Sequence, residues 1–197
     1  RRVLFRSNRK DQELDIILIS AKDGQVLKNL TSGFDQSRGW EYIVTSGGMR
    51  GNLVPWISWA PVGDHIAYFV RTEKYKTLII QNAVSGRVEQ RFEMKTLDMP
   101  ESPAFSPDGK KVAFSAMSMA VADIYVIDLA TGQITNATKD AFADYSPTFA
   151  PDGKSLVYTA RISGNDKLFS LDLATGAKKQ LTFGTHDDTG EIGRAHV

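Results

Sequence analysis

The chain has 197 residues, of which 42% are apolar, and none is Cys, so disulfides, thiolate metal sites and a cysteine nucleophile are excluded. No apolar run reaches the roughly 18 residues of a membrane-spanning helix, and the length is that of one or two domains with a hydrophobic core. The 24 basic and 23 acidic residues give a formal charge of +1, which excludes the strongly basic surface of a nucleic-acid-binding protein.

The two ends of the chain, RRVLFRS at 1–7 and EIGRAHV at 191–197, read as translated DNA adapter. Back-translation of RRVLFRS as CGA CGT GTG CTC TTC CGA TCT gives, in reverse complement and another frame, the codons for EIGRAHV. One inverted repeat therefore encodes both ends and resembles a short-read library adapter, so we expect 1–7 and 191–197 to be artefact. Four of the basic residues and one acidic residue lie there, which leaves 20 bases and 22 acids in 8–190.

The first predicted elements lie in 8–31. Residues 15–20 form an apolar run typical of a buried strand, residues 22–24 supply a hairpin turn, and residues 25–31 form an outer strand. The strand that should precede them falls at Val3, Leu4 and Phe5, inside the adapter-derived heptad. This segment predicts part of a small antiparallel sheet.

Residues 32–54 form a connection of about two dozen residues, longer than ordinary connections between strands. The segment carries Arg38, Trp40, Tyr42 and Arg50, and Trp, Tyr and Arg are the residues enriched at binding hot spots. The alternative is a small hairpin that turns at Gly47-Gly48 and buries its own aromatics. The Gly-Gly stretch lacks the Lys-Ser/Thr of a phosphate-binding loop, so nucleotide binding is not expected.

Three later segments repeat without a gap: WAPVGDHIAYFV, FSPDGKKVAFSA and FAPDGKSLVYTA. Their prolines, Pro61, Pro107 and Pro151, are 46 and then 44 residues apart, and a glycine follows each proline by 25 residues, at Gly86, Gly132 and Gly176. A repeat of this length with strand-like composition is typical of a propeller blade.

Each repeat predicts four short strands. The inner strand ends at Trp59, Phe105 or Phe149, an Asp-Gly turn (Val62-Gly63-Asp64 in the first repeat) follows, and two nearly continuous apolar strands and an outer strand complete the unit. We therefore expect an all-β fold of about fourteen strands, a partial β-propeller with about three and a half four-stranded antiparallel blades of a larger, six- to eight-bladed ring. The expected blades are 8–31 (partial), 55–96, 101–139 and 145–183, with Tyr68, Phe114 and Tyr158 buried between them.

The pattern SPDGKKVAFSA…DIYVIDLATGQITNAT resembles the WD-repeat-like blades of TolB-type β-propellers, over residues 8–190. Propellers of this type bind partner proteins of the cell envelope, and related blades precede the hydrolase domain of prolyl-oligopeptidase-like serine peptidases. The resemblance implies a non-catalytic propeller that binds a protein or peptide, in the periplasm or secreted. The alternative is the gating propeller of a serine peptidase whose hydrolase domain lies beyond this sequence.

Propeller geometry places the inter-blade connections and the loops between second and third strands on one face, and variable loops on a rigid scaffold are where recognition concentrates. These loops are 32–54, 71–76, 95–101, 117–122, 139–145, 161–166 and 184–190. The residues that we expect to contact a partner are Arg38, Trp40, Tyr42, Arg50, Lys74, Tyr75, Asp144, Tyr145, His186 and Asp187.

No catalytic arrangement is expected, because the sequence contains no GxSxG, no HExxH and no Cys. His65 lies at a turn-to-strand junction, where a structural role is expected, and His186 with its neighbouring aspartates fits a polar connection to a further blade. Asp140 and Asp144 match no calcium-loop spacing and are expected to cap turns, so no metal or cofactor is expected. A partial ring leaves uncovered blade faces, so we also expect non-native self-association.

Overall fold

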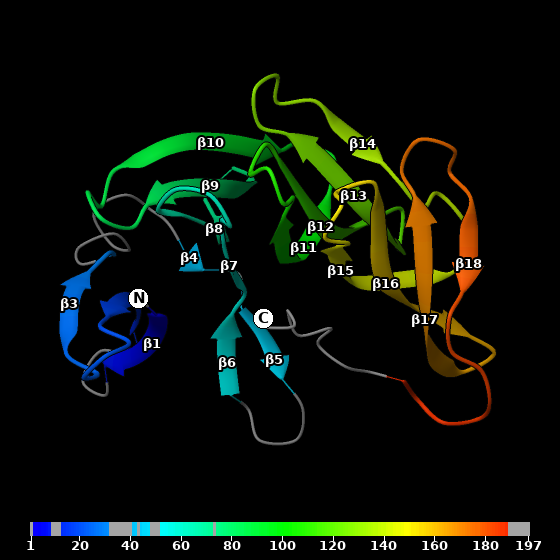
Figure 1. Cartoon of the computed structure of the whole chain (residues 1–197), viewed down its shortest axis with the longest axis horizontal. Helices are drawn as coiled ribbons and strands as arrows, with labels where there is room; N and C mark the ends of the chain where they lie inside the picture. The colour runs from blue at the N-terminus through cyan, green and yellow to red at the C-terminus, as the bar shows by residue number, and fades with distance from the viewer. Residues whose placement is uncertain are drawn as a thin grey trace.

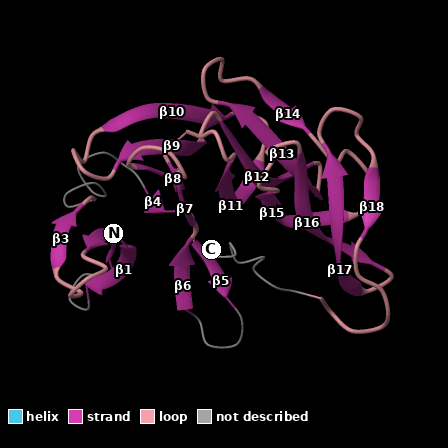
Figure 2. Cartoon of the chain, in the orientation of Figure 1, coloured by secondary structure: helices cyan, strands magenta, loops and turns pink. Residues whose placement is uncertain are grey.

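The computed structural model of the chain describes residues 2–8, 13–31, 41–42, 44–47, 52–72 and 74–188. These residues form 18 strands and no helix, so none of them forms a helix that would span a bilayer. Four antiparallel sheets follow one another around an open arc (Figures 1 and 2). The chain is thus all-β and a partial β-propeller, as its sequence predicts. Four strands add to the fourteen expected: β1 (Arg2–Asn8), which coincides with the strand position at Val3–Phe5, and β4 (Glu41–Tyr42), β5 (Val44–Gly47) and β6 (Asn52–Pro55).

Each sheet is one blade, and the blades are numbered here in chain order. Blade 1 contains β1, β2 (Glu13–Ile19) and β3 (Val26–Asn29). Blade 2 contains β4, β7 (Ile57–Trp59), β8 (His65–Arg71), β9 (Lys76–Asn82) and β10 (Val88–Met94). Blade 3 contains β11 (Asp98–Phe105), β12 (Lys111–Ser118), β13 (Val121–Asp128) and β14 (Ile134–Asn136). Blade 4 contains β15 (Ala143–Phe149), β16 (Ser155–Ile162), β17 (Asn165–Asp172) and β18 (Lys178–Gln180).

The repeated glycines occupy equivalent positions in the blades. Gly86, Gly132 and Gly176 all have φ between 72° and 78°, a conformation that costs glycine little. The N–H of each donates to the carbonyl oxygen of the residue four positions earlier, at 2.8 to 2.9 Å. In blades 3 and 4 that earlier residue is an aspartate, Asp128 or Asp172, whose carboxylate also accepts from the two backbone amides inside the turn. The sequence repeat is therefore a repeat of hairpin geometry.

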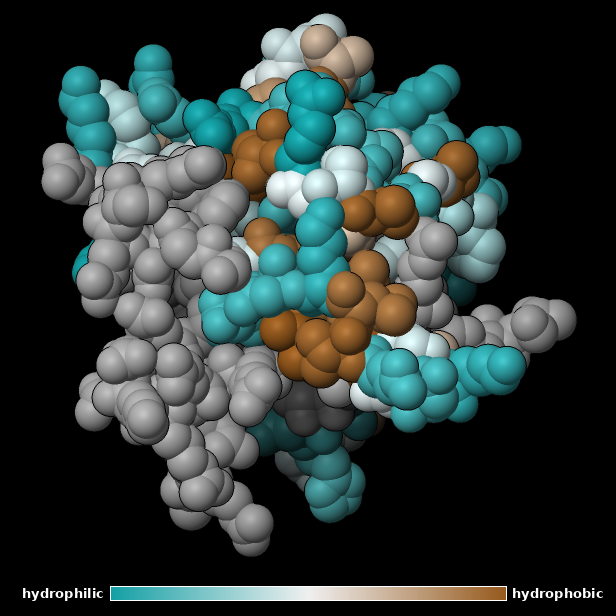
Figure 3. Space-filling model, turned by 90° about the vertical axis from the view of Figure 1, so that its left-hand side faces the viewer, coloured by the Kyte–Doolittle hydropathy of each residue, from teal (hydrophilic) through white to brown (hydrophobic). Residues whose placement is uncertain are grey.

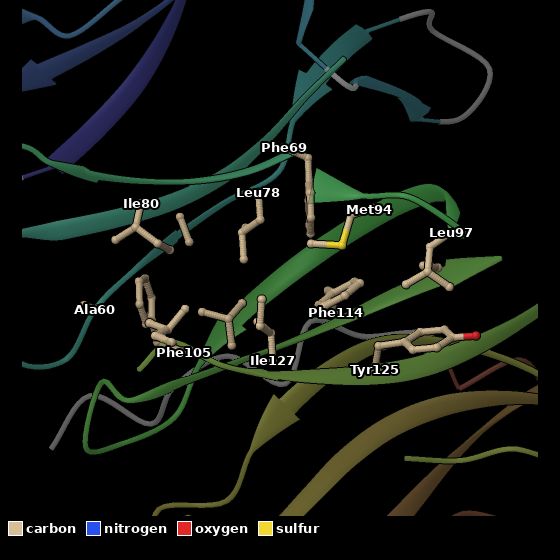
Figure 4. Packing of buried hydrophobic residues seen from close by; sticks show 14 residues of the cluster. Ala60, Phe69, Leu78, Ile80, Met94, Leu97, Phe105, Phe114, Tyr125 and Ile127 are labelled. Atoms are coloured by element: carbon tan, nitrogen blue, oxygen red, sulfur yellow. The ribbon is translucent and has the colours of Figure 1, made fainter. Parts of the chain in front are cut away.

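The hydrophobic core lies between neighbouring blades. Tyr68, Phe114 and Tyr158 are 0%, 0% and 1% exposed, which confirms their predicted burial. Phe114 of blade 3 packs against Phe69 of blade 2 with ring centroids 5.3 Å apart, and Leu78, Ile80 and Met94 complete this layer (Figure 4). Strands β8, β9, β12 and β13 are nearly continuous apolar runs because both of their faces are covered by sheets.

The inner strand of blade 2 is split by an insertion. Strand β7 pairs with the first half of β8 (Ile57 opposite Tyr68), whereas β4 pairs with its end, with Tyr42 opposite Val70. In blade 4 the equivalent partner, Ala160, lies opposite Asp144 of one continuous inner strand. The blade therefore begins at β4 rather than at residue 55, and the segment 32–54 is not only a connection between blades.

The inserted segment contains the hairpin β5–β6, which pairs from Val44 opposite Pro55 to Gly47 opposite Asn52. This hairpin lies on the inner side of the arc of blades (Figure 1). The alternative prediction of a hairpin is thus correct for the backbone, although Gly47 is the last paired residue of β5 rather than part of the turn. The side chains of this hairpin lie outside the described residues.

Candidate binding face

The two ends of the sheets present different connections. We call the end that carries residues 71–76, 95–101, 117–122, 139–145, 161–166 and 181–188 the loop face, and the end with the Pro-Asp-Gly turns and Gly hairpins the turn face. An ion pair between Lys76 and Asp98 joins blades 2 and 3 at the loop face, and another between Lys178 and Asp140 joins blades 3 and 4. The loop ends of successive blades are therefore held side by side.

Two of the predicted recognition loops are tighter than expected. Strands β12 and β13 are joined by only Met119 and Ala120, and β16 and β17 by only Ser163 and Gly164. All four residues have positive φ, as a two-residue hairpin turn requires. The longer loops of the loop face are therefore 71–76, 95–101, 139–145 and the insertion in blade 2.

Of the candidate residues, Arg38, Trp40 and Arg50 lie outside the described residues, and Tyr42 is placed by its backbone alone, at the loop end of β8. Lys74 and Tyr75 share that end of blade 2. Lys74 Nζ lies 5.6 Å from the centroid of the Tyr75 ring, and Tyr75 N–H donates to Thr72 Oγ1 at 3.0 Å. The structure thus brings one cation and one aromatic ring together in a hydrogen-bonded loop.

Tyr145 lies near the loop end of the inner strand of blade 4 and is partly buried. Burial raises the pKa of Tyr145, and the neighbouring Glu101 carboxylate raises it further. Burial likewise raises the pKa of Glu101, which precedes a Ser-Pro pair in β11 as Tyr145 does in β15. Glu101, which was not among the candidate residues, therefore lies near Tyr145, on the inner strand of the neighbouring blade.

Asp144 does not cap a turn, contrary to the prediction. Its side chain is 0% exposed, and neither carboxylate oxygen has a hydrogen-bond partner. Burial raises its pKa to about 7; the Thr138 hydroxyl and Lys178 act to lower the pKa, and the nearby Asp140 and Asp123 carboxylates act to raise it. Asp140 does behave as predicted, because its Oδ1 accepts the Phe142 N–H at 2.7 Å. The spacing in sequence could not separate these two roles, since the neighbour Asp123 belongs to another blade.

His186 and Asp187 are both exposed and form part of a structural connection. The His186 carbonyl oxygen accepts from Lys167 Nζ, and Asp187 Oδ1 accepts the Asp166 N–H at 3.0 Å. Lys167 is 3% exposed and also bonds Asp188 Oδ2 at 2.7 Å, a role that the sequence analysis missed. The polar-connection interpretation of this segment therefore describes these contacts, and His186 and Asp187 do not bond to each other as an acid–base pair would.

His65 is a turn-face residue, and two grooves lie between neighbouring elements of the blades. His65 Nε2 is 2.8 Å from Glu89 Oε2, which fits its predicted structural role. A groove of about 580 Å³ runs between blades 2 and 3, past Arg91, Phe92 and Ile134. A second groove of about 360 Å³ lies between β13–β14 and the hairpin at Gly176. No candidate residue lines either groove, but the first groove reaches the loop face at Thr72, whose Oγ1 accepts the Tyr75 N–H, and at Lys95.

Comparison with known proteins shows which family this chain resembles. A sequence model of the family described as TolB beta propeller domain matches residues 49–192. Dipeptidyl-peptidase 5 of Porphyromonas gingivalis is 30% identical over an alignment of 137 residues; the match covers 60% of this chain and 18% of the peptidase.

Solved structures share the fold at lower identity. TolB from Acinetobacter baumannii matches with a TM-score of 0.68 and 23% identity, over 94% of this chain and 41% of that one. A structure from a study of two prolyl endopeptidases matches with a TM-score of 0.63 and 14% identity, over 93% of this chain and 28% of that one. The chain thus spans less than half of either structure and under a fifth of the curated peptidase. The family match covers most of the chain and coincides with blades of the expected geometry, so this chain belongs to the TolB beta-propeller family.

Proposed function

We propose that this chain is a non-catalytic propeller that binds protein or peptide partners through its loop face, in the periplasm or outside the bacterial cell. The observation that carries the proposal is the exposure of large apolar side chains on that face. Met119 at the tip of the β12–β13 turn is 95% exposed, Phe183 is 74% exposed, and Met99 and Phe142 are exposed as well. Flexible methionines and aromatic rings on a rigid frame are surfaces that peptides bind.

The charges on the loop face favour binding through direct contacts rather than through long-range electrostatic attraction of a partner. Lys76 pairs with Asp98 and Lys178 with Asp140, and the chain without its terminal heptads carries nearly equal numbers of acids and bases. A balanced surface gives little steering, so affinity depends on the apolar and aromatic contacts themselves.

Comparison of the two faces tests this proposal. Peptides selected from a displayed library against the whole chain would be titrated against wild type, Met119→Ser/Phe142→Ser on the loop face, and Val62→Ser/Val84→Ser on the turn face. Val62 and Val84 are also exposed, so the control removes apolar surface without touching the loops. We expect the loop-face variant to bind about tenfold more weakly or worse and the control to bind as wild type. Loss of binding in the control alone would overturn the proposal.

A second function is favoured by the identity to a peptidase. Dipeptidyl-peptidase 5 is 30% identical to this chain over 137 residues. On this alternative the chain is the propeller of a serine peptidase and restricts access to a hydrolase domain. The sequence of the DNA that adjoins the coding region decides between the two: a GxSxG motif between a predicted strand and helix supports the peptidase.

A further inference from the structure

Three carboxylates from two blades meet at the loop face. Asp123 stands in β13 of blade 3, Asp140 in the connection between the blades, and Asp144 in β15 of blade 4. One oxygen of each lies within 4.8 Å of the oxygens of the other two. Like charges this close repel one another, so an arrangement of this kind needs a compensating group.

Two of the three carboxylates have local partners. Asp123 accepts from Thr138 Oγ1 at 3.1 Å and from Asn136 Nδ2 at 2.8 Å. Asp140 accepts the Phe142 N–H and pairs with Lys178. Lys178 also donates to the Thr138 carbonyl oxygen, and its charge acts on Asp144 as well, lowering the pKa of that carboxyl.

Asp144 lies close enough to Thr138 and Lys178 for both to lower its pKa, but neither forms a hydrogen bond with it. It is fully buried and both of its oxygens lack a hydrogen-bond partner. A buried carboxylate is retained when it is paired or when it coordinates a metal, because an uncompensated charge away from water is costly. Asp144 lies among the Asp123 and Asp140 oxygens, so a cation that compensates its charge would be shared with them.

We propose that Asp123, Asp140 and Asp144 bind one calcium ion between blades 3 and 4. All three donors are carboxylate oxygens, the ligands that hard divalent cations prefer. When ionised, the three carboxylates and the single ammonium of Lys178 have a net charge of about −2, which a divalent cation would balance. Calcium suits the site better than magnesium, because Mg²⁺ usually keeps several waters and takes only one or two carboxylates, whereas Ca²⁺ takes more carboxylate oxygens in a flexible geometry.

Calorimetric titration of the metal-free chain with CaCl₂ tests the site. We expect one Ca²⁺ per chain and a higher melting temperature when it is bound. Asp144→Asn keeps the shape and removes the unpartnered charge, so it should weaken Ca²⁺ binding at least tenfold. Asp152→Asn is the matched control, because Asp152 is an exposed turn-face carboxylate whose Oδ1 caps Lys154 N–H at 2.9 Å. The control should bind Ca²⁺ as wild type.

Three results would overturn the inference. The first is no binding with Ca²⁺ at about 10 mM, above the dissociation constants of weak extracellular sites. The second is equal Ca²⁺ affinity in wild type and Asp144→Asn, and the third is tighter binding of MgCl₂ than of CaCl₂. Should Asp144→Asn fail to fold, Asp140→Asn decides instead. Asp140 is partly exposed, so its isosteric change leaves the core intact, and unchanged affinity in that variant equally rejects the site.

Discussion

Phe114 is the residue at which two blades depend most directly on one side chain. Its ring contacts Phe69 across the blade boundary, and it stacks on Tyr125 within its own sheet with centroids 5.9 Å apart. Truncation leaves a cavity that neither rigid sheet fills. We expect Phe114→Ala to lower the free energy of unfolding by about 3–5 kcal/mol, measured by urea denaturation.

The matched control for this truncation is Met119→Ala. Met119 is almost completely exposed, so its loss should change the free energy of unfolding by no more than about 0.5 kcal/mol. Equal effects of the two substitutions would show that Phe114 is not packed between blades, and the strand register would then be wrong.

Residue roles were predictable from sequence where they depend on near neighbours. The repeat identified Tyr68, Phe114 and Tyr158 as buried, because their strands carry apolar residues for both faces. Asp144 was assigned wrongly because its surroundings come from blade 3, and no spacing within 139–145 reports them. The role of Lys167 was not predicted for the same reason: its partners His186 and Asp188 lie beyond the next hairpin in the sequence.

A set of side-chain hydrogen bonds, here called the bracket, joins the last two strands of a blade. In blade 1, Thr31 Oγ1 accepts the Ile16 N–H at 2.8 Å and donates to Asp15 at 3.2 Å, and Asn29 donates to the same carboxylate. Blade 3 repeats these contacts with Thr138, Asp123 and Asn136. The outer strand is short and has few backbone hydrogen bonds to its neighbour, so the bracket helps to fix its position.

Removal of the threonine hydroxyl tests the bracket. Thr31→Val keeps the shape but leaves the buried Ile16 N–H without an acceptor, which should cost about 1–3 kcal/mol in thermal or urea unfolding. Thr135→Val, an exposed threonine in β14, is the control and should be neutral or slightly stabilising. No loss in Thr31→Val would mean that water replaces the hydroxyl and that the bracket is not needed.

The insertion in blade 2 carries Trp40, a candidate for contact with a partner. Trp40 immediately precedes β4, whose backbone lies at the loop end of β8. We expect Trp40→Ala to weaken binding of a selected peptide by about 2 kcal/mol or more, as truncation of an interface hot spot does, without lowering the melting temperature.

Calorimetric titration combined with a thermal melt of the same variant checks this prediction. A lower melting temperature would show that the indole belongs to the core of the hairpin. Unchanged affinity in a folded variant would remove Trp40 from the binding surface.

The strands of the three full repeats were predictable because each contains the same turns at the same distances from a proline. The split inner strand of blade 2 was not, because β4 has only two residues and its pairing with β8 spans the insertion. The loops 117–122 and 161–166 were predicted too long. Strand pairing continues through Ser118 and Ile162, and non-glycine residues adopt the positive φ that sequence reasoning reserves for glycine.

For the whole molecule, the open arc leaves apolar surface at its first blade. Val26 and Leu27 are consecutive on β3, so they point to opposite faces, yet both are more than half exposed. On this side of the molecule hydrophobic groups stand among hydrophilic ones (Figure 3). We expect the 197-residue chain to self-associate with increasing concentration in sedimentation velocity, because uncovered blades and strand edges pair. A single monomeric species at every concentration tested would contradict this expectation.

Binding through the loop face is the central claim, and hydrogen–deuterium exchange of the chain with and without a selected peptide tests it most directly. We expect slower exchange at 74–76, 98–101, 117–122 and 140–145, with no change at the turns 61–64, 107–110 and 151–154. Protection confined to those turns, with exchange on the loop face unchanged, would contradict the account.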